Sequence, residues 1–435
     1  MAPSGLVDAA LASGARMVVL EGHWSPGRRL RSAGLSPLRF LPLPSVEEPE
    51  LLLPLEQPEP LRYALEGWAP PARRWKRIRN LLLQVLARRG VLPPVRPLVT
   101  VALRDPEPPF LIALARQLGV PADARWLLAP GQGDVLTRGA FHVFLPGSVA
   151  PSWVLKFARV PGLREPFDRD ERGLRIAQSA GGAAAAHAPR LVGRLELDGL
   201  HASLETAAVG QRLVTYLHSS ASRAAKERVV ERVASWLVDV ARETASPPGA
   251  LEAERVRLAR EVVPRWRSLG SSTDLVERLP SLPAVLQHND VGSWNVVLGE
   301  GRFTVIDWES TRETGFPLWD LWYLLADALP HLDGATGLGA QEEYFVRLFS
   351  GELASSELLF GWTRRMAAAL SIPPEAVGPL STLCWLDHGL SHAERQESLD
   401  SHAVGEQAPV FLAQRIPALW YSHPALGPGW NRWRA

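Results

Sequence analysis

The sequence predicts a mixed α+β protein in which a β-rich front part is followed by a mainly helical part. Up to about residue 210, short apolar runs alternate with Pro, Gly and Glu, which is typical of short strands. Beyond residue 211, apolar residues recur at helical spacing, with one β-rich interruption at residues 284–309. These two patterns favour strands and helices that are segregated along the chain.

Length and pattern divide the chain into three parts. Its 435 residues are enough for two or three domains. Residues 1–122 mix short strands with helices and predict an accessory α+β domain. Residues 123–210 predict a sheet interrupted by one helix, and residues 211–435 predict a helical domain.

Composition excludes several classes of protein. Lys and Arg (47) nearly balance Asp and Glu (46), so we expect no nucleic-acid partner. Cys384 is the only cysteine, which excludes an intrachain disulfide and fits a reducing compartment. No apolar stretch is long enough to span a membrane, and the first residues lack a signal-peptide pattern. We therefore expect a cytoplasmic protein.

Residues 285–309 carry the strongest chemical signal. WNVVLGEGRFTVIDWE predicts a hairpin with Gly-Glu-Gly at its tip, which places Asp290, Asn295 and Asp307 at loop or strand ends. Carboxylate and amide oxygens are hard ligands suited to Mg²⁺. Phosphoryl transfer to a hydroxyl needs an aspartate that accepts the proton and ligands that hold the metal on the phosphates. Asp290 fits the first role and the other two fit the second, with an ordinary hairpin of solvated acids as the alternative.

The segments HNDVGSWN and IDWE resemble the catalytic and metal-binding loops of the aminoglycoside phosphotransferase and choline kinase-like family. The resemblance covers about residues 125–400. It implies a bilobal protein-kinase-like fold, with a small β-rich N-lobe and a large helical C-lobe, and ATP and Mg²⁺ as cofactors. One departure is Asn289, where Gly is commoner, and we expect it to alter loop packing rather than chemistry.

The resemblance also assigns roles to single residues. Asp290 would be the catalytic base or the carboxylate that orients the acceptor. Asn295 would bind one Mg²⁺, and Asp307 would bridge the metals to the β- and γ-phosphates. Three further side chains would support the site: His288 by bracing the loop, Glu309 through the waters of the metal, and Asp320 at a helix start by tying the loop down.

Lysine is rare in this Arg-rich chain, so a lysine at position 156 indicates that the position needs an ammonium group. It lies on the apolar strand WVLKFARV, where the kinase fold places the lysine that holds the α- and β-phosphates. A lysine at a strand edge facing water is the alternative. Glu171, on the next helix, is the best candidate to pair with Lys156. Asp168 and Asp170 compete for that role, and a merely acidic first helical turn is equally consistent with the sequence.

Two segments would complete the nucleotide site. GQGDVLTRG contains Gly131 and Gly133 and would either cradle the phosphates or form an ordinary turn, since it is not a GxGxxG. SLETAAVGQ resembles the hinge after the last strand of the N-lobe. Glu205 and Ala207 would contribute to nucleotide binding there, with backbone groups of residues 206–208 meeting the adenine edge.

Two other segments leave alternatives open. Residues 73–96 hold eight Lys or Arg and no acid, which suits either docking to an anionic membrane surface or glycan carrier, or a solvated helix face. His388 and His392 lie at i and i+4, with Asp387 beside them. The alternatives there are a metal site, a surface for a cationic acceptor and a solvated face, and we expect the solvated face.

Together these observations predict an ATP- and Mg²⁺-dependent phosphotransferase that acts on a hydroxyl of a small molecule. The long N-terminal part and its basic segment favour a sugar or surface-glycan intermediate as the acceptor. The alternative acceptor is an aminoglycoside or another amino-alcohol, which predicts an acidic pocket, whereas a sugar predicts aromatic and amide groups. A nucleotide-binding pseudokinase that regulates or scaffolds a partner is the alternative class. Tryptophans that suit a sugar site are Trp319, Trp322, Trp362 and Trp385.

Overall fold

The computed structural model divides the chain into two compact units. Unit 1 comprises Met1–Phe167 and Arg190–Val209, and unit 2 comprises Asp168–Pro189 and Gly210–Ala435. The basic segment at residues 73–96 lies outside the described residues, apart from Val85. The structure describes residues 17–22, 27–32, 34–44, 49–55, 57–64, 85, 98–104, 110–131, 138–247, 249–402 and 412–434.

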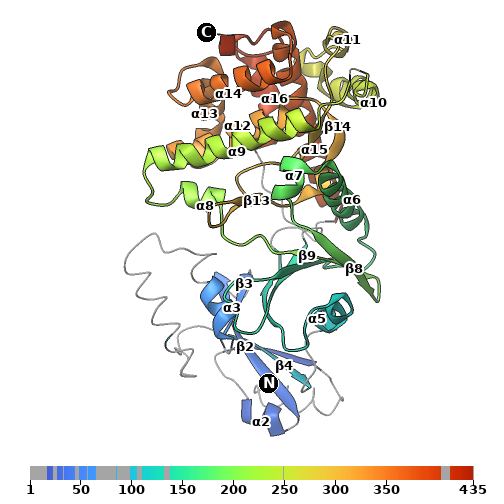
Figure 1. Cartoon of the computed structure of the whole chain (residues 1–435), viewed down its shortest axis with the longest axis vertical. Helices are drawn as coiled ribbons and strands as arrows, with labels where there is room; N and C mark the ends of the chain where they lie inside the picture. Colours follow the sequence, from blue (N-terminus) through green and yellow to red (C-terminus); the bar gives the residue numbers. More distant parts are fainter. Residues whose placement is uncertain are drawn as a thin grey trace. The chain divides into compact units, whose positions relative to one another are not determined.

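Within the described residues, unit 1 is built on one antiparallel sheet of nine strands in the order β1-β4-β2-β3-β5-β6-β7-β9-β8. Several of these strands are labelled in Figure 1. The short apolar runs bounded by Pro and Gly are confirmed as strands. Their bounds are β1 (Met17–Gly22), β2 (Leu35–Pro44), β3 (Pro49–Pro54), β4 (Leu98–Arg104), β5 (Arg125–Ala129), β6 (Gly139–Phe144), β7 (Trp153–Phe157), β8 (Leu191–Leu197) and β9 (Leu200–Thr206). Short helices of this unit are α2 (Gly27–Ser32), α3 (Pro58–Tyr63) and α5 (Phe110–Ala115).

The N-terminal strands continue the sheet of the predicted N-lobe. Strand β3 pairs with β5 at Leu52 and Leu128. Across this junction, the rings of Phe40 and Trp126 stack with their centroids 5.2 Å apart, within one hydrophobic core. The predicted boundary at residue 122 falls inside unit 1, and an independently folding accessory domain stays a prediction.

The turn between β8 and β9 sets the register of these two strands. Asp198 and Gly199 both have positive φ (51° and 78°), as a two-residue Asp-Gly hairpin turn requires. On its other side, β9 pairs with β7, where Lys156 lies opposite Ser203. This pairing sets the polar face of the sheet.

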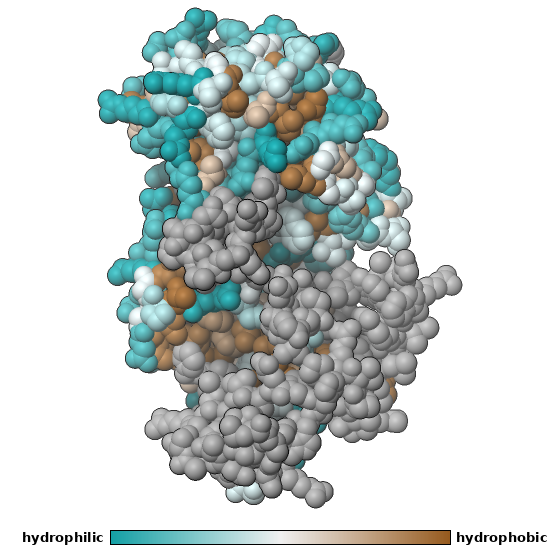
Figure 2. Space-filling model, turned by 180° about the vertical axis from the view of Figure 1, so that it is seen from behind, coloured by the Kyte–Doolittle hydropathy of each residue, from teal (hydrophilic) through white to brown (hydrophobic). Residues whose placement is uncertain are grey.

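Unit 2 is mainly helical, so the two units together confirm the predicted α+β class (Figure 1). Its helices are α6 (Glu165–Ala180, which begins in unit 1), α7 (Gly182–His187), α8 (Leu213–Leu217), α9 (Arg223–Glu243), α10 (Glu252–Arg257), α11 (Asp274–Glu277), α12 (Trp319–Asp333), α13 (Leu338–Ser350), α14 (Ser356–Ala369), α15 (Val377–His402) and α16 (Leu412–Ser422). On the face seen in Figure 2, hydrophilic residues cover most of the described surface of this unit, with a few hydrophobic patches among them. Among the described helices, none is long and apolar enough to cross a membrane.

Five short strands of unit 2 form two small sheets beside these helices. One has the order β10-β12-β13 and the other pairs β11 with β14. The predicted hairpin is confirmed, with Val296 opposite Val305. The loop from β11 to β12 therefore carries Asp290 and Asn295, and the segment after β13 carries Asp307. The bounds are β10 (Gln211–Arg212), β11 (Val285–Gln287), β12 (Val296–Leu298), β13 (Phe303–Val305) and β14 (Arg312–Gly315).

Candidate active site

The start of the loop between β11 and β12 is fixed by Asp320 in the first turn of α12. The backbone N–H groups of His288 and Asn289 donate to its two carboxylate oxygens, each at 2.7 Å. Burial raises the pKa of Asp320 to about 6, against the opposing effect of these two donors. A carboxylate at a helix N-terminus also interacts favourably with the helix dipole. Asp320 thus lies where the resemblance implies, tying the loop to the helix.

The backbone conformation of Asn289 explains why asparagine can replace the family's commoner glycine at this position. Its φ is 67°, in the left-handed region where Gly is unstrained and Asn is among the tolerated residues. Its Oδ1 also accepts a hydrogen bond from Gln287 Nε2 at 3.1 Å. The asparagine therefore keeps the backbone shape and adds a side-chain bond that glycine would lack.

His288 links this loop to the segment after β13. Its Nδ1 accepts the backbone N–H of Asp290 at 3.2 Å, so its Nε2 carries the hydrogen and donates to the carbonyl of Ile306 at 3.1 Å. The ring packs edge-to-face on Trp308, with the centroids 4.7 Å apart. His288 is buried and braces the two loops against each other.

Asp290 and Asn295 are in direct contact. Asn295 Nδ2 donates to both the main-chain carbonyl and Oδ2 of Asp290, each at 2.9 Å. The second carboxylate oxygen, Oδ1, accepts the hydroxyl of Tyr323 at 3.0 Å. With Nδ2 engaged, Oδ1 is the Asn295 atom suited to a cation.

The charge around Asp290 is strongly negative. Burial raises the pKa of Asp290 to about 7, the nearby charge of Asp307 adds to this, and Glu309 and Asp327 contribute less. The hydrogen bond from Tyr323 acts in the opposite direction. Burial raises the pKa of Tyr323 well above its usual value, so its hydroxyl remains a donor. The predicted carboxylates thus share one electrostatic environment.

Asp307 follows β13 in a constrained backbone. Its φ is 69°, and a short 3-10 helix begins at Trp308. The N–H of Ile306 donates to the carbonyl of Asn295 at 2.8 Å, which joins the two predicted metal-binding positions. Helix α6 passes so close that a Cβ on Gly173 would lie 1.9 Å from the carbonyl oxygen of Trp308. The shape of this segment therefore depends on a glycine in a neighbouring helix.

The donor set fits Mg²⁺ bound together with phosphate. Within the described residues, no group of three or more His, Cys, Asp or Glu is placed to hold a metal by itself. Mg²⁺ in phosphate-transfer sites takes one or two carboxylates and completes its shell with water and substrate oxygens. Asn295 Oδ1 and the Asp307 carboxylate supply oxygens of this kind, in a place where the excess negative charge favours a cation.

Two residues that sequence reasoning missed also hold the site. Tyr323 binds Asp290, and Asp327 Oδ2 accepts the backbone N–H of Ser293 at 2.5 Å. With Asp320 they lie at i, i+3 and i+7, which is one face of a helix. This spacing after a helix-start aspartate is the sequence feature that could have indicated both residues.

The expectation of a solvated face at residues 387–392 is wrong for its first two residues. Asp387 is buried and forms ion pairs with Arg257 and Arg312, at 2.6 and 2.9 Å. His388 is also buried and stacks on the ring of Tyr323, with the centroids 4.4 Å apart. Burial lowers the pKa of His388 to about 3, so it is a neutral packing group behind Tyr323.

Two of the predicted nucleotide residues of unit 1, Lys156 and Glu205, lie on the adjacent strands β7 and β9. Lys156 Nζ is 3.1 Å from Glu205 Oε2. The N–H of Ala207 donates to the carbonyl of Ser152 at 3.0 Å, so an adenine contact by this segment would fall to its other backbone groups. Gly131 has a positive φ of 82°, and Gly133 lies outside the described residues.

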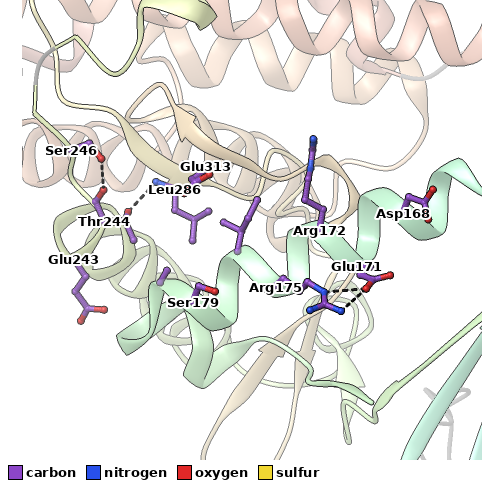
Figure 3. A pocket seen from close by; sticks show the side chains of 12 residues that line it. Asp168, Glu171, Arg172, Arg175, Ser179, Glu243, Thr244, Ser246, Leu286 and Glu313 are labelled. Carbon is purple, nitrogen blue, oxygen red and sulfur yellow. Dashed lines mark hydrogen bonds and ion pairs between the residues drawn. The ribbon is translucent and has the colours of Figure 1, made fainter. Parts of the chain in front are cut away.

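Glu171 belongs to unit 2, and its pairing with Lys156 stays a prediction. Its carboxylate accepts two hydrogen bonds from Arg175, at 2.7 and 3.0 Å (Figure 3). Both residues lie at a cavity of about 630 Å³ that does not include Asp290, Asn295 or Asp307. The cavity is lined by Asp168, Glu171, Arg172, Arg175, Ile176, Ser179, Ala180, Glu243, Thr244, Ser246, Leu286 and Glu313.

Comparison with known proteins agrees with this geometry. No curated protein matches the chain. A model of the phosphotransferase enzyme family matches residues 140–365, just over half of the chain, including the strand of Lys156 and the whole of residues 288–320. The resemblance to aminoglycoside phosphotransferases and their kinase-like fold is thereby confirmed, and the chain belongs to the phosphotransferase enzyme family.

Proposed function

We propose that the protein is an ATP- and Mg²⁺-dependent kinase that transfers the γ-phosphoryl group of ATP to a hydroxyl of a small molecule. The contact between Asp290 and Asn295, with Asp307 close by, is the observation that carries this proposal. It combines a candidate proton acceptor with two oxygen donors for a cation. Membership of the phosphotransferase family supports the same reaction type.

Asp290 would act on the acceptor. As the acceptor oxygen bonds to the γ-phosphorus, the bond from that phosphorus to the β-γ bridging oxygen breaks, ADP leaves and the hydroxyl proton passes to Asp290. A pKa of about 7 suits an acid–base group that works near neutral pH. The hydrogen bonds from Tyr323 and Asn295 fix the orientation of the carboxylate, so its position does not depend on the acceptor.

The remaining groups would hold the phosphates. Asn295 Oδ1 and Asp307 would bind Mg²⁺, with Glu309 acting through its waters. The ion supplies positive charge that offsets the charge developing on the transferred group. Lys156 would contact the α- and β-phosphates through its ammonium group.

The acceptor stays a proposal. The long N-terminal part favours a sugar or surface-glycan intermediate, but the four tryptophans expected to suit a sugar are buried in unit 2: Trp319, Trp322, Trp362 and Trp385. Trp294, beside Asn295, is 53% exposed and would be an aromatic side chain available to an acceptor.

The charge near Asp290 favours the second candidate, an amino-alcohol acceptor. Asp327 and Glu309 both add negative charge to its environment. Asp327 is partly exposed on α12 one turn beyond Tyr323. A cationic amine next to the reacting hydroxyl would be attracted there, whereas a neutral sugar would gain nothing from this charge.

A panel of acceptors tests the function. ADP release from Mg·ATP would be measured with neutral sugars, sugar phosphates, amino-alcohols and aminoglycosides, on the wild type and on Asp290→Asn. We expect turnover with one class and a loss of roughly 10²–10⁴-fold in Asp290→Asn, while Mg·ATP still binds. Binding of Mg·ATP without turnover on any acceptor would favour the pseudokinase instead.

A further inference from the structure

We propose that Glu205, on the strand next to Lys156, is the positioning residue that holds the Lys156 ammonium for phosphate binding. This assignment rests on the proposed function. The family resemblance gives this task to Glu171 on helix α6. The structure shows an acidic partner for Lys156 inside the sheet that carries it, at 3.1 Å.

Strand register explains why these two side chains meet. Lys156 lies opposite Ser203, and Val154 lies opposite Glu205, in the antiparallel pair of β7 and β9. Residues two apart on a strand share a face, so Lys156 and Glu205 are diagonal neighbours on one face. Diagonal neighbours are within reach of long side chains, and the residue directly opposite Lys156 is the small Ser203.

The opposite face of the same strands is apolar. Leu155 and Leu204 are fully buried in the core of unit 1. A one-residue slip of the register would turn Lys156 and Glu205 into that core, at a large cost for two buried charges. The core therefore fixes the register, and the register fixes the ion pair.

Burial makes the two charges depend on each other. The Lys156 side chain is 12% exposed and that of Glu205 is 4% exposed. A buried charge without its partner is strongly unfavourable, which keeps the ammonium beside the carboxylate. An ammonium has three donors, so it can bind a carboxylate and phosphate oxygens at the same time.

Glu171 is in a different situation. It is part of unit 2, where its carboxylate accepts two hydrogen bonds from Arg175 on the same face of α6. Its side chain is 23% exposed, compared with 4% for Glu205. Positioning by Glu205 ties the lysine to the sheet itself, so it needs no particular placement of α6.

Binding titrations on the full chain test the assignment. The Kd of Mg·ATP would be measured by calorimetry for the wild type, Glu205→Gln and Glu171→Gln, with adenosine as a phosphate-free probe. We expect Glu205→Gln, which keeps the shape but loses the charge, to weaken Mg·ATP by about fivefold or more, a coupling typical of residues in contact. Adenosine should bind equally to the wild type and to Glu205→Gln, because Glu205 acts on the phosphates through Lys156.

Glu196→Gln is the matched control, since Glu196 is an acid of the neighbouring strand β8 whose side chain is 61% exposed. It should change the Kd by less than about twofold. The assignment is overturned if Glu205→Gln leaves the Kd of Mg·ATP unchanged, if it weakens adenosine equally, or if Glu171→Gln has the larger effect. If the wild type does not bind Mg·ATP at all, the proposed function is contradicted, and this assignment, which rests on it, is contradicted too.

Discussion

The loop of Asp290 in unit 2 and the strand of Lys156 in unit 1 are held in place by different means. The loop is irregular, and side chains of α12 that lie 31 to 34 residues later in the chain bind its backbone and its carboxylate. Lys156 needs no such tethers, because the pairing of β7 with β9 already determines its neighbours. Substitutions around the loop should therefore alter the site over long sequence distances, whereas those around Lys156 should act within the sheet.

The largest effect is expected where α6 approaches the Asp307 segment. A Cβ on Gly173 would lie 1.9 Å from the carbonyl oxygen of Trp308, and backbone cannot move aside as a flexible side chain can. We expect Gly173→Ala to lower the free energy of unfolding by about 3 kcal/mol, as overpacking does. Urea denaturation followed by circular dichroism would measure this.

Gly361→Ala is the control for Gly173→Ala. Gly361 lies inside α14, and a Cβ there would meet nothing within 4 Å. Because Ala has the higher helix propensity, this variant should be as stable as the wild type or more stable, by up to about 1 kcal/mol. Equal stability of the two variants would show that α6 does not constrain the Asp307 segment.

A second prediction concerns the stability of the site at neutral pH. The pKa of Asp290 is raised to about 7 in the folded protein, above the value near 4 of an unfolded chain. Between pH 4 and 7 the folded state therefore binds more protons, so this group lowers stability as the pH rises through that range. Asp290→Asn should be more stable than the wild type at pH 8 by an amount on the order of 2 kcal/mol, and less so at pH 5.

Thermal unfolding at the two pH values, without added metal, would check this prediction. An advantage of Asp290→Asn that is equal at both pH values would contradict the raised pKa. A loss of stability at pH 8 would contradict the view that the clustered carboxylates repel one another.

The smallest effect is expected from Tyr323→Phe. It removes the hydrogen bond that the hydroxyl donates to Asp290 Oδ1. Because this bond lowers the pKa of Asp290, its loss raises that pKa, and the acidic limb of the pH–rate profile should move to higher pH. We expect kcat to fall about tenfold, the size of one bond to a charged group, with little change in the KM for ATP. The control is Tyr344→Phe, whose hydroxyl binds Asp333 instead, and its pH profile should not move. A matching shift in both variants would mean that Tyr323 acts only through stability.

Sequence patterns predicted the elements that local chemistry decides. The Asp-Gly turn at Asp198 and the helix Arg223–Glu243 are elements of this kind, because turn residues and apolar spacing set them. The Ala/Gly stretch at residues 181–189 gave no such signal, yet helix α7 forms there. It is held from a distance: Glu243 accepts the N–H of Ala183, and Trp236 donates to the carbonyl of the same residue.

The candidate site was predictable to the same extent. The spacing of Asp290, Asn295 and Asp307 marks the loops, and two of these three residues prove to be in direct contact. Tyr323 could not be assigned to Asp290 from spacing alone, because the link depends on how α12 packs on the loop. The partner of Lys156 in the sheet was missed for a similar reason, since strand register is not visible in a single strand.

The stability of the protein with and without Mg·ATP tests the central claim most directly. A ligand that binds only the folded state raises the protein's free energy of unfolding by about 2.7 kcal/mol when the free ligand concentration is a hundred times Kd. We predict a magnesium-dependent rise in the unfolding temperature of the wild type that is lost in Asp307→Ala. No rise in the wild type, or an equal rise in Asp307→Ala, would contradict a nucleotide site built on these loops.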